Sequence, residues 1–177
     1  MRRFLDRLYL AAAYLAACCV LLIMLLMIGQ SILREFQVRT GPINDMVSWL
    51  CAAASFFAMA HAFKHGDFVR VTLLLDRLSV PAQKRFELAA LSIAAVAVAY
   101  LAWWANRFTY ESWAFNDIAQ GMLPWPLWIP QLSFALGSIL LLVAVLDELV
   151  IVLRGGRPSY VVAVEERHAK GDFSADV

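Results

Sequence analysis

The chain has 177 residues, of which 62% are hydrophobic and 16% are charged, and its formal net charge is +1. Soluble domains hold about 45–50% apolar and about 25% charged residues, so this composition excludes an ordinary soluble enzyme and a disordered protein. A net charge this close to zero argues against a nucleic-acid partner.

The charged residues leave four long uncharged windows. The windows lie between Arg7 and Arg34, Asp45 and Lys64, Glu87 and Arg107, and Asp117 and Asp147, and hold 26, 18, 19 and 29 residues. About 20 residues of helix cross the hydrocarbon layer of a membrane. We therefore predict an all-α integral membrane protein with spans over about residues 8–32, 42–64, 86–106 and 127–153.

Proline and glycine predict where two of these spans begin and end. Pro42 suits the first turn of the second span, and Gly66, directly after Lys64 and His65, suits its C-terminal cap. The fourth window is too long for one helix. Its three prolines predict that the window opens with an irregular loop, which leaves the helix at about 127–153.

Lysines and arginines predict the orientation. With the amino terminus in the cytoplasm, twelve of the fifteen fall on the cytoplasmic side, and only Arg34, Arg39 and Arg107 fall on the other. This asymmetry predicts that both termini are cytoplasmic. The apolar run after Arg7 continues far beyond the hydrophobic core of a signal peptide, so we expect an uncleaved first helix.

Two further segments lie on the cytoplasmic side. Residues 67–78 carry an apolar stripe of helical spacing, with Arg70 and Arg77 elsewhere on the helix, which predicts a short amphipathic helix on the membrane surface. That helix could brace a partner subunit or act as a simple connector. Residues 154–177 mix charges of both signs with glycine and proline, so we expect a flexible tail after a membrane domain of residues 1–153.

The sequence contains no recognisable catalytic or cofactor-binding set. His61 and His65 share one span, and no second span supplies the facing histidine that a haem would require. Further ligands for a metal are not evident near them, and the cysteines are best explained as small packing residues. We therefore predict no enzyme activity, no cofactor and no metal.

Two features of the fourth span could serve packing. Asp147 and Glu148 are the charges nearest the membrane interior, and they could pair with Arg154 at the interface or with a partner helix. Ser133 and Gly137 have the spacing of small residues that lets helices approach closely, within the chain or toward a partner. Tryptophans including Trp125 and Trp128 gather at the outer side, where they fit either an aromatic belt or a docking face.

Two segments resemble a known family. Lys64-His65-Gly66-Asp67-Phe68-Val69-Arg70-Val71, with the leucine-rich residues 73–78, resembles the inner-loop motif in the small four-span membrane subunit of tripartite ATP-independent periplasmic (TRAP) transporters. Phe68 and Thr72 stand where that family commonly has histidine and aspartate. The segment Gly121 to Gln131, with its prolines and tryptophans, resembles the entry to the family's last span.

The resemblance implies a small accessory subunit in the bacterial inner membrane. Its implied partners are a large multi-span permease subunit, which carries the sodium and substrate sites, and a periplasmic protein that captures a carboxylate-bearing solute. Membrane lipids surround the chain. Residues on the outer side that could contact the periplasmic protein, or could be solvated only, are Arg34, Arg39, Arg107, Glu111 and Asp117. A membrane scaffold or assembly factor without a transport partner is the alternative.

Overall fold

The computed structural model describes residues 2–66 and 80–169, and this part of the chain contains five helices. The helices are α1 (Arg2–Glu35), α2 (Gly41–His65), α4 (Val80–Ala114), α5 (Trp128–Leu153) and α6 (Ser159–Ala169). Four of them are long and apolar enough to cross a membrane, which confirms the predicted four-span, all-helical class. The expected surface helix at 67–78, with Arg70, lies outside the described residues.

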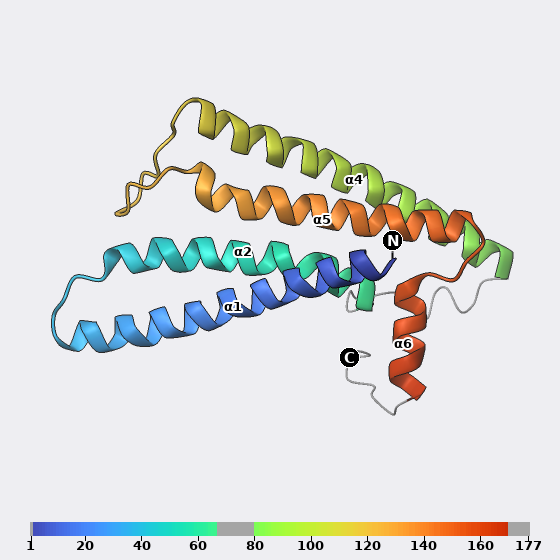
Figure 1. Cartoon of the computed structure of the whole chain (residues 1–177), viewed down its shortest axis with the longest axis horizontal. Helices are drawn as coiled ribbons and strands as arrows, with labels where there is room; N and C mark the ends of the chain where they lie inside the picture. The colour runs from blue at the N-terminus through green and yellow to red at the C-terminus, as the bar shows by residue number, and fades with distance from the viewer. Residues whose placement is uncertain (1, 67–79, 170–177) are drawn as a thin grey trace.

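The four long helices lie side by side in the order α1, α2, α5, α4 (Figure 1). Helices α1 and α4 form the two edges of this layer. Figure 1 also shows that α1 begins, and α6 lies, at one end of the layer, which we call the tail end. The loops that join α1 to α2 and α4 to α5 lie at the opposite end, which we call the loop end.

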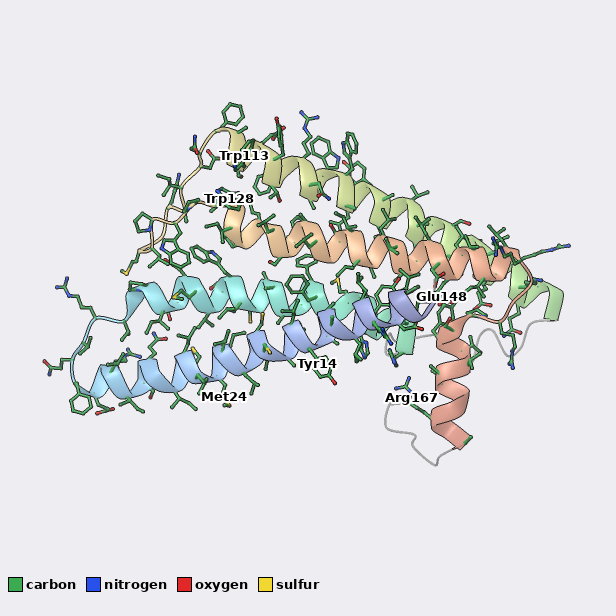
Figure 2. All side chains as sticks on the ribbon, in the orientation of Figure 1. Tyr14, Met24, Trp113, Trp128, Glu148 and Arg167 are labelled. Carbon is green, nitrogen blue, oxygen red and sulfur yellow. The ribbon has the colours of Figure 1, made fainter. Side chains whose placement is uncertain are left out.

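This arrangement leaves much apolar surface uncovered. Helix α5 has neighbours on both sides and carries nine buried residues, whereas α2 carries one. Tyr14 and Met24 project from α1 on the side away from α2 (Figure 2), and they are 66% and 49% exposed. The outer surfaces are therefore suited to contact with lipid or with another membrane protein, because exposing apolar faces of this extent to water is unfavourable.

Helix α4 is longer than the uncharged window predicted, since it continues to Ala114 and not to about residue 106. The charge at Arg107 does not end it, because Arg107 and Glu111 form an ion pair one helical turn apart. The helix ends where Asn116 adopts a left-handed conformation with a φ of 53°. The spacing of charges therefore underestimates the length of α4.

The second span has the ends that its sequence predicts. Pro42 lies in its first turn, and Gly66 adopts the left-handed conformation with a φ of 74°. The N–H group of Gly66 donates to the carbonyl oxygens of Ala62 and Phe63 and so caps the last turn.

The segment after α5, where the sequence predicts a flexible tail, contains the helix α6 over Ser159–Ala169. Tyr160 anchors this helix. It is buried with Leu91 of α4 and Val152 of α5, and its ring packs against that of Phe63 of α2 at 5.8 Å between centroids. Burial of this aromatic side chain, with Val161 packed against the same cluster, explains how α6 docks although half of its other residues are polar.

Candidate functional site

A group of charged side chains joins α2 to α5 near the tail end. The ammonium group of Lys64 donates to a carboxylate oxygen of Asp147 and to Oε1 of Glu148, the latter at 2.9 Å. The side chains of Lys64 and Glu148 are 10% and 0% exposed. Charges this deep at the end of membrane helices require partners, and here each sign supplies the other.

Glu148 uses both of its carboxylate oxygens. Oε1 accepts from Lys64, and Oε2 accepts from the backbone N–H of Ser159 at 2.8 Å. Figure 2 shows Glu148 beside the start of α6. The residue therefore connects α2, α5 and α6 at one point.

The sequence offered two partners for Asp147 and Glu148, namely Arg154 and a helix of another protein. In the structure, Lys64 of the same chain pairs with both acids. Sequence reasoning missed this because Lys64 and Glu148 are 84 positions apart and nothing in one sequence orders the helices. The signal available was a single lysine at the end of one span and two adjacent acids at the matching depth of another.

Gly137 lies at a close contact between α2 and α5. A Cβ atom at Gly137 would lie 2.7 Å from the carbonyl oxygen of Phe56 and 2.6 Å from its Cβ. Beside this contact the rings of Phe56 and Phe134 meet edge to face at 4.6 Å between centroids. The small-residue motif could have served packing within the chain or toward a partner. The contact with Phe56 shows that Gly137 packs within the chain. Ser133 is half-buried, and its hydroxyl donates to the carbonyl oxygen of Pro130 on its own helix.

At the loop end, residues 115–127 fold back on themselves. A short bridge pairs Ile118 with Pro126, and the N–H of Ala119 donates to the carbonyl oxygen of Trp125 at 2.9 Å. Large apolar side chains on this loop are exposed: Phe115, Ile118, Met122 and Trp125.

Asp45 of α2 holds this loop. Its carboxylate accepts from the N–H of Leu123 at 3.3 Å, and it lies so close to Gly121 that any side chain there would displace it. Gly41 is packed against the side chain of Met122 in the same way. Two glycines thus let the loop rest directly on the first turns of α2, a role that the sequence did not reveal for either Asp45 or Gly41.

The other residues predicted to meet a partner are also at the loop end. Arg34, Arg39 and Asp117 are exposed. Arg107 and Glu111 pair with each other at 2.8 Å on the last turns of α4, beyond the span expected at about 86–106.

The two tryptophans have different environments. Trp125 is partly exposed and its ring lies 6.2 Å from that of Trp49. Trp128 lines a groove of about 310 Å³ between α4 and α5, together with Asn106, Trp113 and Leu132. Figure 2 shows Trp113 and Trp128 at the loop-end parts of α4 and α5.

Metal ligands do not converge in the described part of the chain, where no group of three or more histidine, cysteine or acidic residues is close enough to hold an ion. The polar side chains instead fix helices and loops to one another. Lys64 with Glu148 joins the helices at the tail end, and Asp45 fixes the loop at the other. This arrangement provides a fixed structure that spans a membrane and exposes broad apolar faces.

Such a layer of four long helices defines a multi-pass membrane protein. The family of tripartite ATP-independent periplasmic transporters, DctQ component, matches residues 23–155, which cover all of α2, α4 and α5. The chain belongs to this family. It is therefore the small permease component of a TRAP transporter, which belongs to a transporter family and not to an enzyme family.

A search of the curated proteins finds no match to this chain. The family match and the four membrane-capable helices together support the bacterial inner membrane as its location and imply partner subunits. They also establish the resemblance that the motifs at Lys64–Leu78 and Gly121–Gln131 suggested.

Proposed function

We propose that the chain is the accessory, scaffold subunit of a sodium-coupled importer of a carboxylate-bearing solute. In this proposal both termini are cytoplasmic, so the tail end faces the cytoplasm and the loop end faces the periplasm. The family match over residues 23–155 carries the proposal, because it makes the chain one component of a tripartite system. A large permease subunit moves the solute, and a periplasmic protein delivers it.

The polar contacts of the spans support a scaffold role. An ion path needs ionisable groups that can change partners within the membrane. In the described spans, Lys64 pairs with Asp147 and Glu148 at the tail end, and Glu148 also accepts from the N–H group of Ser159. Nearer the loop end, the side chain of Gln30 donates to that of Asn44 at 2.9 Å, which joins α1 to α2. These contacts hold helices in place.

We assign the large subunit to the exposed face of α2. This face carries a line of small or polar residues at helical spacing: Ser48, Cys51, Ala52 and Ser55. By contrast, the exposed line on α5 is made of large aliphatic residues, among them Leu136, Ile139 and Leu146. Small residues let another helix backbone approach closely, whereas large aliphatic residues match lipid tails, so α2 is the better surface for a protein helix.

We assign the periplasmic protein to the loop end. Helix α4 has 35 residues and is about 50 Å long, which exceeds the hydrocarbon thickness of about 30 Å. The loop at 115–127 therefore projects toward the periplasm, and Asp45 fixes its shape before any partner binds. Exposed side chains including Met122, Trp125 and Asp117 give it the mixture of apolar and charged groups that protein interfaces use.

The experiment that tests this function omits one component at a time. The purified complex, the complex without this chain, and this chain alone are reconstituted into liposomes with an inward sodium gradient and the periplasmic protein outside. Uptake of the solute that the periplasmic protein carries is expected only for the whole complex. Equal uptake without this chain, or uptake by this chain alone, would refute the proposal.

A further inference from the structure

Helix α6 contacts the tail ends of three different helices. It packs against α2 (Figure 1), and its Tyr160 hydroxyl donates to Oε1 of Glu87 on α4 at 2.9 Å. Its first N–H group, that of Ser159, donates to Glu148 on α5. Helix α6 lies at a steep angle to the long helices, at the end of the layer that they form (Figure 1).

The contact with Glu148 uses a general property of helix ends. The N–H group of Ser159 belongs to the first residue of α6, so it has no carbonyl partner within the helix. A carboxylate is favourable there, because it accepts this hydrogen bond and faces the positive end of the helix dipole. Glu148 is fully buried beneath α6, and Lys64 balances its charge.

The other side of α6 is fitted to the end of α2. A Cβ atom at Gly66 would lie 2.8 Å from the carbonyl oxygen of Tyr160 and 2.8 Å from a methyl group of Val164. The guanidinium of Arg167 donates to the carbonyl oxygen of His65 at 2.6 Å. Gly66 therefore serves two purposes, since its left-handed conformation caps α2 and its lack of a side chain admits α6.

We propose that α6 acts as a staple that fixes the tail ends of α2, α4 and α5 relative to one another. Glu148 holds the start of α6, because it accepts the hydrogen bond from Ser159. The staple belongs to this chain alone and does not require a partner. Its consequence for assembly rests on the proposed function: by fixing α2 it holds the face that receives the large subunit. Helix α6 is then a structural part of the membrane domain.

Ser159 allows a sharp test because proline is well tolerated at the first position of a helix. Ser159→Pro removes the N–H donor and keeps the helix, whereas Ser159→Ala removes only the hydroxyl and keeps the donor. Hydrogen exchange of the purified full chain is measured for both variants. Since a hydrogen bond to a charged group is lost, Ser159→Pro is expected to speed exchange in α6 about tenfold or more, and Ser159→Ala to leave it unchanged.

The position of the change along the chain decides the outcome. The proposal expects faster exchange in α6 and at the tail ends of α2 and α4, with the loop at 115–127 unaffected. Equal exchange in the two variants, or an acceleration as large at the loop end as at the tail end, would overturn it. Tyr160→Phe, which keeps the ring and removes the bond to Glu87, provides a second test and is expected to speed exchange at the start of α4.

Co-purification with the large subunit separates this inference from the proposed function. Reduced co-purification for Ser159→Pro, but not for Ser159→Ala, would support the consequence for assembly. If neither variant nor the unaltered chain captures a large subunit while the exchange rates differ as expected, the staple is supported and the proposed function is contradicted.

Discussion

Lys64 of α2 and Glu148 of α5 lie 84 positions apart in the sequence, and their side chains form an ion pair of 2.9 Å with almost no exposure. This pair converts two adjacent spans into one unit at the tail end. Both carboxylate oxygens of Glu148 accept hydrogen bonds within the chain, Oε1 from Lys64 and Oε2 from the N–H group of Ser159.

Replacing Lys64 tests how much this ion pair contributes to the stability of the chain. Lys64→Met is expected to lower the free energy of unfolding by about 3–5 kcal/mol, because it leaves two acids without their cation in a buried site. The measurement is unfolding by SDS titration in mixed micelles. The matched control is Arg107→Met, which breaks the exposed pair with Glu111 and should cost no more than about 1 kcal/mol. Similar losses of unfolding free energy in the Lys64→Met and Arg107→Met variants would contradict the burial of Lys64 and Glu148.

Gly137 provides a test of helix packing. Gly137→Ala is expected to destabilise the chain by about 1–3 kcal/mol, since the new methyl group would overlap the backbone of Phe56. Gly29 is the control, because a Cβ atom there meets nothing within 4 Å. Gly29→Ala should be neutral or stabilising by up to about 1 kcal/mol, as expected for a helix interior. The account fails here if both substitutions have the same sign and size.

The loop end can be tested through Gly121. Gly121→Ala is expected to displace the carboxylate of Asp45 and release the loop, so the loop tryptophan Trp125 should become more accessible to iodide quenching. Binding of the periplasmic protein should weaken in parallel. Gln120→Ala, at the exposed neighbouring position, should change neither property. A Gly121→Ala chain that binds and quenches like the unaltered one would argue against a preformed loop.

The face assigned to the large subunit can be tested with one pair of substitutions. Ala52 on α2 and Ala97 on α4 are both exposed. Ala52→Leu is expected to reduce co-purification of the large subunit, because the larger side chain blocks close approach of a helix, while Ala97→Leu should not. Neither change should alter the stability of the isolated chain. A loss confined to Ala97→Leu would move the interface to α4.

The sequence predicts the four spans well because lipid imposes a length and a composition that can be read directly from the spacing of charges. It predicts the cap at Gly66 for the same kind of local reason. It does not predict the end of α4, since the charges of Arg107 and Glu111 close the uncharged window although both residues lie within the helix. It also fails to predict α6, whose formation depends on burial of Tyr160 by three other helices.

The contacts of the candidate site were harder to predict. Asp147 and Glu148 stand out in a single sequence because acids are costly within an apolar span, and Gly137 stands out because it has the small-residue spacing with Ser133. Their partners, Lys64 and Phe56, become evident only when the order of the helices is known, and apolar faces of similar composition do not specify that order. The sequence therefore identifies residues that need a specific neighbour, and the structure identifies which neighbours these are.

The most direct measurement of the central claim is affinity purification of the tagged full-length chain from its native membrane in mild detergent, followed by mass spectrometry of the proteins that accompany it. The account predicts a larger multi-span permease in fixed proportion to this chain, and loss of that protein from the Ala52→Leu variant. A chain that purifies alone, as a stable species without a larger membrane partner, would contradict the account.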